Sequence, residues 1–198
     1  MMSKRIGVDV DGCLANFNQA FIGLLIAQSG RDLFPVHPYD PAEWHYPATL
    51  GYTTEEMDRT WAHIEASTEF WENLDGYPDA AQFLRNLDWR HRRAGDDIYF
   101  ITSRPGRRAK EQTEAWLDLR GFEGATVLIS SLKQLCCTAL QLDYYLDDRT
   151  ENLVDVVCEF EFTGASARAY RLMRPWNRPV YGCEDVKSLA EFLERIKE

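Results

Sequence analysis

Residues 6–14 read Ile-Gly-Val-Asp-Val-Asp-Gly-Cys-Leu, and the prediction of the fold starts from this stretch. A short apolar run, Arg5–Val10, is typical of a buried strand, and Gly12 lets the chain turn sharply after it. Ligands of open α/β sheets bind at the carboxyl ends of the strands, so Asp9 and Asp11 would project into a ligand site. Two carboxylates this close repel each other unless a cation bridges them or one is protonated.

Four further segments have the short β-branched and aromatic pattern of buried strands, and helical patterns separate them. This alternation predicts an α/β fold, an open parallel sheet with helices on both faces in the Rossmann-like manner. The predicted strands after the first are Asp97–Thr102, Ala125–Ser130, Asp143–Leu146 and Ala167–Leu172, and the predicted helices between and after them are Gly106–Arg120, Leu132–Leu140, Glu151–Phe160 and Asp185–Ile196.

The alternation is interrupted between the first two strands. Helices are predicted at Asn18–Ser29, Thr53–Ser67 and Pro78–Trp89, and Thr53 with Glu56 fits a capping box. Phe34–Tyr52 is rich in Pro, Tyr, Trp and His and is predicted to be an irregular loop. We therefore expect a small helical cap, residues 18–95, inserted after the first strand of a core formed by residues 1–17 and 96–198.

Composition limits the class of protein. The 198 residues carry a net charge of −10, which disfavours nucleic-acid polymers and anionic membranes as partners. The five cysteines and four histidines form no zinc pattern or disulfide framework. The longest apolar run, residues 20–27, is too short to span a bilayer, and no signal peptide is visible, so we expect a cytoplasmic protein. The sequence leaves open whether it forms a homodimer.

A second acidic cluster follows the predicted strand Asp143–Leu146. If that strand lies beside the first, Asp147 or Asp148 meets Asp9 and Asp11 at one edge of the sheet. Several converging carboxylates form a site for a hard cation, and Mg²⁺ is the natural occupant. Which of Asp147 and Asp148 is the direct ligand stays open.

Two more pieces lie at predicted strand ends. Thr102 and Ser103, with Arg104 after them, could cradle a phosphate with hydroxyl and N–H groups. Lys133 follows the strand that ends near Ser130 and could neutralise both a nucleophile and a phosphoryl group. Each piece alone has an ordinary explanation, as a turn, a helix cap or a surface lysine. Their occurrence at successive strand ends favours a functional site.

These pieces in this order resemble the haloacid dehalogenase superfamily of phosphohydrolases. The four motifs are Asp9 to Gly12, then Thr102, then Lys133, then Asp148 with Asn152. A closer similarity is to the 5'(3')-deoxyribonucleotidases, and it extends over the chain. It is carried by residues 8–17, Phe70–Leu74, Tyr77–Ala80, Ile101–Ser103, Leu146–Arg149 and the basic stretch Arg174–Pro179.

The resemblance implies a mechanism. Asp9 would attack phosphorus and form an aspartyl-phosphate, and Asp11 would protonate the leaving oxygen and then deprotonate water. Asp9, the backbone carbonyl of Asp11, and Asp148 would hold Mg²⁺. Thr102 and Lys133 would bind the other phosphoryl oxygens.

The cap bears on the substrate, which we expect to be a small phosphomonoester and most simply a nucleoside 5'-monophosphate of the deoxyribose series. Nucleobases stack on aromatic side chains, and Phe17 and Trp71 are the candidates for such a pocket, with Arg104 adding specificity. Two alternatives stay open: a phosphatase of another small ester such as a sugar phosphate, and a non-catalytic nucleotide-binding protein of the same fold.

Overall fold

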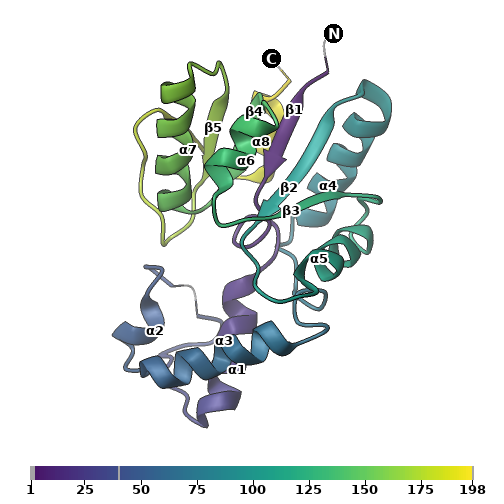
Figure 1. Cartoon of the computed structure of the whole chain (residues 1–198). Coiled ribbons are helices and arrows are strands. Elements are labelled where there is room, and N and C mark those ends of the chain that lie inside the picture. The colour runs from purple at the N-terminus through teal and green to yellow at the C-terminus, as the bar shows by residue number, and fades with distance from the viewer. Residues whose placement is uncertain (1–2, 40, 198) are drawn as a thin grey trace.

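The computed structural model describes residues 3–39 and 41–197 of the chain. Its centre is a six-stranded parallel sheet in the order β3-β2-β1-β4-β5-β6 (Figure 1). The strands are β1 (Arg5–Val8), β2 (Asp97–Thr102), β3 (Thr126–Ile129), β4 (Tyr144–Asp147), β5 (Arg168–Leu172) and β6 (Cys183–Val186). The predicted open parallel sheet is thus confirmed, with each of the five predicted strands present to within two residues at either end.

The central strand β1 is buried on both faces, as its continuous apolar pattern predicts. Ile6 and Val8 are fully buried, and Gly7 lies where a Cβ would come within 2.5 Å of the Leu142 side chain. The register pairs Val8 with Phe100 on one side and with Leu146 on the other. The residues that follow β1, β2 and β4 therefore emerge together at one edge of the sheet.

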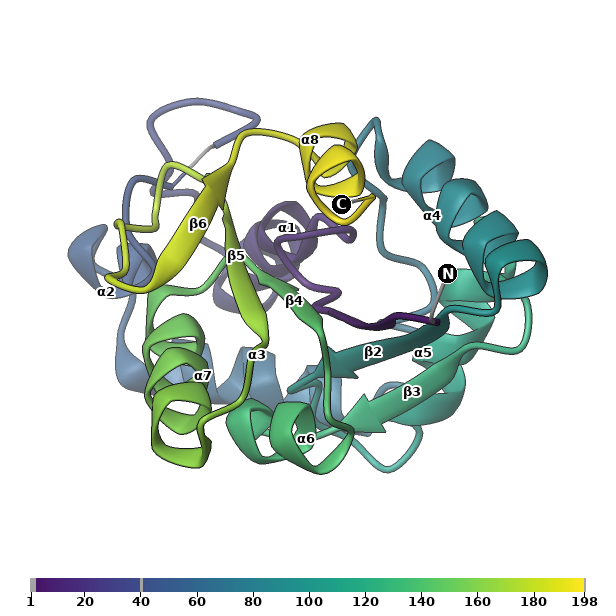
Figure 2. The same cartoon turned by 90° about the horizontal axis from the view of Figure 1, so that it is seen from above.

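Helices cover both faces of the sheet. Viewed from above, α6 (Lys133–Ala139) and α7 (Thr150–Thr163) lie on one face, while α4 (Ala80–Trp89) and α8 (Leu189–Arg195) lie on the other (Figure 2). A fifth helix, α5 (Ala109–Asp118), follows β2 and lies toward the carboxyl ends of the strands. A single π-helical turn, Arg90–Ala94, extends α4.

One prediction at the C-terminal end is wrong. The segment Asp185–Ile196 was expected to be a single helix, but its first residues belong to β6, and the helix begins at Leu189. The sequence Cys-Glu-Asp-Val has little β propensity and no alternation, so local pattern does not mark it as a strand. It becomes one because β5 offers an unpaired edge, where Ala169 aligns with Cys183 and Leu172 with Val186.

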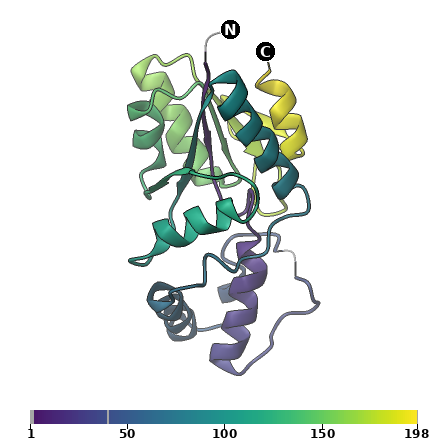
Figure 3. The ribbon, with the colours of Figure 1, turned by 90° about the vertical axis from the view of Figure 1, so that its right-hand side faces the viewer.

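The cap lies beyond the carboxyl ends of the strands, separated from the sheet along the long axis of the molecule (Figures 1 and 3). It contains α1 (Phe17–Ser29), the short α2 (Tyr46–Thr49) and α3 (Thr54–Ala66). The predicted capping box of α3 is present, because Thr53 accepts from the Glu56 N–H and Glu56 accepts from the Thr53 N–H. In the segment 34–52, which was predicted as an irregular loop, α2 is the one helix among the described residues, 34–39 and 41–52.

The position of α4 bears on where the cap ends. Although α4 was expected to belong to the cap, it packs beside the sheet, where Phe83 contacts Phe192 of α8 with ring centroids 6.2 Å apart. We therefore propose that the cap ends near Leu74 and that α4 belongs to the core. The physical reason is its strongly amphipathic face, which buries Phe83, Leu84 and Leu87 against the core.

Candidate active site

The edge where β1, β2 and β4 end gathers the acidic residues of the two sequence motifs. The Asp9 N–H donates to the Leu146 carbonyl at 2.9 Å, which continues the β1–β4 ladder by one residue and places the two motifs side by side. Gly12 comes so close to the second motif that a Cβ there would lie 2.2 Å from Asp148 Oδ2, and its φ is +83°. Only glycine accommodates this approach without strain.

Asp147 and Asp148 are adjacent and both fully buried, yet they have different surroundings. The Asp147 carboxylate accepts from Lys133 Nζ at 2.9 Å, from the Tyr145 hydroxyl at 2.6 Å and from the Asn152 amide at 3.0 Å. It also accepts from the Arg149 N–H at 2.8 Å. Because four donors occupy its oxygens, Asp147 is held as an anchor for Lys133 and the start of α7.

Asp148 faces Asp9 instead. One oxygen of Asp148, one of Asp9 and the Cys13 sulfur all lie within 4.8 Å of one another. Burial, and then repulsion from Asp147, raise the pKa of Asp148 from 3.8 to about 7. Burial also raises the pKa of the Cys13 thiol, which therefore stays neutral near pH 7 and is a poor ligand.

Asp9 is 4% exposed and forms an ion pair with Lys133, whose Nζ lies 2.7 Å from Oδ1. Burial raises the pKa of Asp9; Lys133 opposes that rise, while Asp147 and Asp148 add to it. For Lys133, burial lowers the pKa, but the carboxylates of Asp147 and Asp9 more than offset this and raise it overall. Lys133 is therefore charged at every physiological pH and bridges the two motifs.

The partner of Asp11 is Arg104. The guanidinium of Arg104 donates from Nε and Nη2 to the two Asp11 oxygens at 2.9 and 2.8 Å, and Thr102 Oγ1 donates to one of them at 3.2 Å. The Arg104 side chain is buried, and it also donates to Thr113 and stacks over Trp71. Arg104, which we expected to add specificity for the substrate, lines the pocket with its guanidinium hydrogen-bonded to Asp11.

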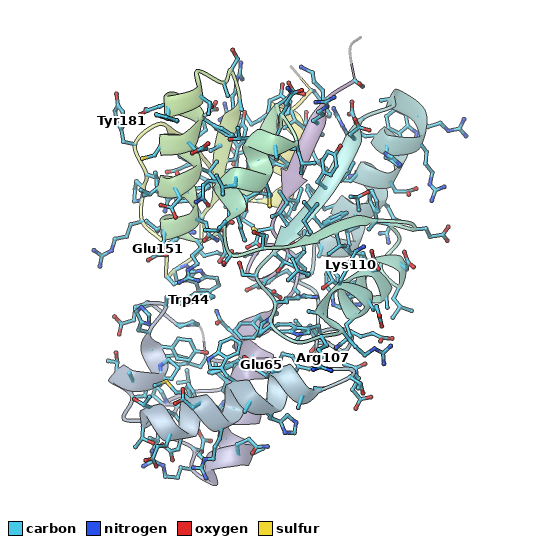
Figure 4. All side chains as sticks on the ribbon, viewed as in Figure 1. Trp44, Glu65, Arg107, Lys110, Glu151 and Tyr181 are labelled. Carbon is cyan, nitrogen blue, oxygen red and sulfur yellow. The ribbon has the colours of Figure 1, made fainter. Side chains whose placement is uncertain are left out.

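Aromatic side chains of the cap cover this edge. The Phe17 ring stacks against the rings of Trp61 and Trp71, whose centroids lie 5.6 and 5.7 Å from its own. Trp44 of the cap lies next to the core, and the Arg149 guanidinium is 4.9 Å from the centroid of its ring (Figure 4). One pocket is lined by the acidic residues and this aromatic wall together: Asp9, Asp11, Phe17, Trp44, Trp61, Trp71, Thr102, Ser103, Arg104, Pro105, Lys133, Asp148, Arg149 and Asn152.

The structure therefore brings all nine sequence-predicted site residues to one pocket, and it gives them unequal positions. Thr102 is buried beside Asp11, whereas Ser103 is exposed and donates to the Ser130 carbonyl. Trp71 is 2% exposed and its indole donates to the Pro105 carbonyl at 3.0 Å, so it acts mainly as packing between cap and core.

A family model described as "5' nucleotidase, deoxy (Pyrimidine), cytosolic type C protein" matches residues 3–197. The chain belongs to this family. It is therefore a phosphatase of the 5'-nucleotidase type, as the motifs predict. The search among curated proteins found no match.

Solved structures show the same fold at low sequence identity. The HAD-hydrolase YfnB of Bacillus subtilis, solved with bound magnesium, matches with a TM-score of 0.61 and 12% identity over 100% of both chains. A hydrolase from Pseudomonas syringae matches with a TM-score of 0.58 and 13% sequence identity, over 99% of this chain and 98% of its own. The L-2-haloacid dehalogenase of Xanthobacter autotrophicus matches with a TM-score of 0.57 and 12% sequence identity, over 99% of each of the two chains. The haloacid dehalogenase-type fold of this nucleotidase-family chain is confirmed.

Three residues behind the acidic edge had no role assigned from the sequence. The Trp176 indole donates to Asp148 Oδ2 at 2.7 Å, and the Asn177 amide donates to the Asp148 carbonyl at 2.6 Å. Arg174 donates to the carbonyls of Gly12 and Cys13 at 2.8 and 3.1 Å. The sequence marks residues 174–179 as a basic, proline-containing stretch. Only the fold shows that this stretch contacts Asp148 and the backbone after β1.

No helix within residues 3–39 and 41–197 is long and apolar enough to cross a membrane.

Proposed function

We propose that the protein is a Mg²⁺-dependent, cytoplasmic hydrolase of nucleoside 5'-monophosphates, with deoxyribonucleotides as the preferred class. The observation that carries this proposal is the buried Asp9 carboxylate, paired with Lys133 at 2.7 Å and facing Asp148 beneath an aromatic cap. The family description, which names a deoxy nucleotidase of cytosolic type, supports the substrate and the location.

Asp9 is the proposed nucleophile. Lys133 holds Oδ1, and among the described residues no hydrogen bond to Oδ2 is found, so this oxygen is free for in-line attack on phosphorus. The attack forms an aspartyl-phosphate and releases the alcohol, and water then hydrolyses the acyl phosphate. Lys133 and Thr102 would bind the phosphoryl oxygens as charge develops on them.

Asp11 is the proposed acid and base. It would protonate the leaving oxygen in the first step and deprotonate the attacking water in the second. The two hydrogen bonds from Arg104 fix its orientation toward the pocket. Arg104 is thereby a positioning residue for Asp11 in this proposal.

The donor set fits Mg²⁺. Asp9 and Asp148 are buried carboxylates whose pKa values are raised by burial and by neighbouring carboxylates, so a cation between them would relieve an unfavourable charge. Oxygen ligands are what Mg²⁺ prefers, and we propose Asp9, the Asp11 carbonyl and Asp148 as the ligands that hold it. When bound, the ion supplies positive charge that orients and neutralises the phosphoryl group.

The test is phosphate release from a panel of esters with Mg²⁺. We expect nucleoside 5'-monophosphates to exceed sugar phosphates in kcat/KM, and Asp9→Asn to lower kcat by on the order of 10³-fold or more while the circular dichroism spectrum stays unchanged. Retained activity in Asp9→Asn would remove the covalent mechanism. Faster turnover of phosphosugars than of every nucleotide would remove the substrate class while leaving the phosphatase chemistry.

A further inference from the structure

The segment 124–142 exposes an uncharged surface in a strongly charged chain. It forms β3, the turn that follows and α6, and its one charged residue is Lys133, which is only 3% exposed. Charged residues make up 27% of the whole chain. The large apolar side chains of Ile129, Leu132 and Leu135 are exposed here, by 40%, 53% and 49%. Exposed apolar side chains gathered in an uncharged surface indicate a protein–protein contact.

Helix α6 places its exposed apolar residues on one side. Leu132, Leu135 and Ala139 follow one another at intervals of three and four residues, and all three are exposed. Helix α7 packs along a different flank of α6, where Thr138 and Phe160 line one cavity. Figure 2 shows α6 between α7 and the edge strand β3. Helix α7 therefore leaves the exposed side of α6 uncovered.

Beside α6, the strand β3 has an unprotected edge. It is the outermost strand on its side of the sheet, so its outer backbone groups have no ladder partner among the described strands. Edge strands usually carry a charge, a proline or a bulge that prevents further pairing. Thr126–Ile129 has none of these, and its register with β2 runs without interruption. Next to this edge, Tyr99 and Leu128 are only half-buried. The edge and the adjoining sheet face are therefore open to a partner.

The net charge of the chain indicates which partner fits this surface. The chain carries a net charge of −10, so two copies repel each other in most orientations. The repulsion is weakest where uncharged surface meets uncharged surface. A second copy also matches β3, because an edge strand can pair antiparallel with its own copy about a two-fold axis. Both arguments favour a second copy of this chain over a charged partner.

We propose that the protein forms a homodimer through this surface, with the two β3 strands paired antiparallel and the two α6 helices beside the junction. The surface, which we call the β3–α6 face, consists of Thr126, Leu128, Ile129, Leu132, Leu135 and Ala139. Such a dimer goes beyond the proposed function and does not depend on the chemistry at Asp9. It bears on the active site because α6 also carries Lys133, whose Nζ lies 2.7 Å from Asp9. The dimer would hold in place the helix that supplies this lysine.

Analytical ultracentrifugation tests the β3–α6 face against another apolar helix surface. Val154 of α7 is 43% exposed, close to the 49% of Leu135, so Leu135→Glu and Val154→Glu place the same charge at similarly exposed helix positions. Wild type should sediment as a dimer. Leu135→Glu should raise the Kd of the dimer by about 100-fold or more, because two glutamates would lose their water near each other. Val154→Glu should keep the Kd of wild type, and both variants should keep its circular dichroism spectrum.

Hydrogen exchange of the wild type locates the interface without any substitution. At protein concentrations above the Kd of the dimer, the amides of Thr126–Ile129 should exchange more slowly than below it, since their outer N–H groups become paired. The amides of α7 should exchange at the same rate at both concentrations.

A wild type that stays monomeric at every concentration overturns the proposal. A dimer that Leu135→Glu leaves intact does so too, as does one that Val154→Glu dissociates to the same extent as Leu135→Glu. Slower exchange in α7 but not in β3 would place the interface elsewhere and overturn it as well. None of these results affects the proposed function, which is tested by phosphate release.

Discussion

The acidic edge of the sheet and the aromatic cap above it both bury their side chains, but different interactions hold them in place. At the edge, Asp147 accepts four hydrogen bonds, and Lys133 is paired with both Asp9 and Asp147. In the cap, ring contacts hold the side chains instead, since Phe17 stacks against Trp61 and Trp71 with ring centroids 5.6 and 5.7 Å apart. The acidic edge is therefore organised by charge before substrate arrives, as electrostatic catalysis requires, whereas the cap is organised by apolar packing.

The largest test of this contrast concerns Asp11. Asp11→Asn should slow the first chemical step with 2-deoxyribose 5-phosphate by about 10²–10⁴-fold, because a poor leaving group needs a proton. With p-nitrophenyl phosphate, whose leaving group departs as the anion, the pre-steady-state burst should slow by less than about tenfold. Stopped-flow release of p-nitrophenolate and quenched-flow release of alcohol measure the two steps.

Glu65→Gln, on the exposed surface of α3, is the control for Asp11→Asn and should match wild type with both esters. Equal slowing of both esters by Asp11→Asn would show that Asp11 is not the acid. In that case the acidic edge would not be prearranged for proton transfer.

A smaller effect is expected behind the metal site. Trp176→Phe removes the indole N–H that fixes Asp148 Oδ2, and we expect the affinity for Mn²⁺, used as a Mg²⁺ substitute, to fall about 10–100-fold. Electron paramagnetic resonance of free Mn²⁺ measures this without reference to activity. Trp89→Phe changes an exposed tryptophan outside the site and should bind Mn²⁺ like wild type. Equal affinities for both variants would show that Asp148 needs no support from the 174–177 segment.

The smallest expected effect is the pH dependence of metal stabilisation. The pKa of Asp148 is raised in the folded state from 3.8 to about 7, so its contribution to stability is present below pH 3.8 and is lost as pH rises through about 7. Metal binding needs the deprotonated form. Mg²⁺ at about 100 times its Kd at pH 8 should therefore raise Tm by about 5–10 °C there, and by about a third of that at pH 5.5.

Differential scanning fluorimetry with and without Mg²⁺ measures this dependence. Asp148→Asn should abolish the Mg²⁺-induced increase in Tm at both pH values. An increase in Tm that is equal at pH 5.5 and pH 8 in wild type would contradict the raised pKa of Asp148, and it would mean that this part of the edge is less desolvated than its burial indicates.

The sequence predicted which residues gather at the edge because each of them lies at or just after the end of a strand. A strand that ends in Asp9-Val10-Asp11-Gly12, and three more strand ends with Thr102, Lys133 and Asp148, already specify which residues converge, since parallel strands present their carboxyl ends at one edge. Strand β6 was missed because its short charged sequence becomes a strand only by pairing with β5.

Residue patterns alone specified five of the six strands, the carboxylates at the edge of the sheet and the family to which the chain belongs. Only the tertiary structure distinguished Asp147 from Asp148, because successive residues at a strand end point to opposite sides: Asp147 lies on the side of Tyr145, and Asp148 on the side of Asp9. Only the tertiary structure brought Trp176 to Asp148 and turned Arg104 to Asp11. The contacts of Phe17 with Trp61 and Trp71 likewise depend on packing between distant segments, which no local pattern of residues encodes.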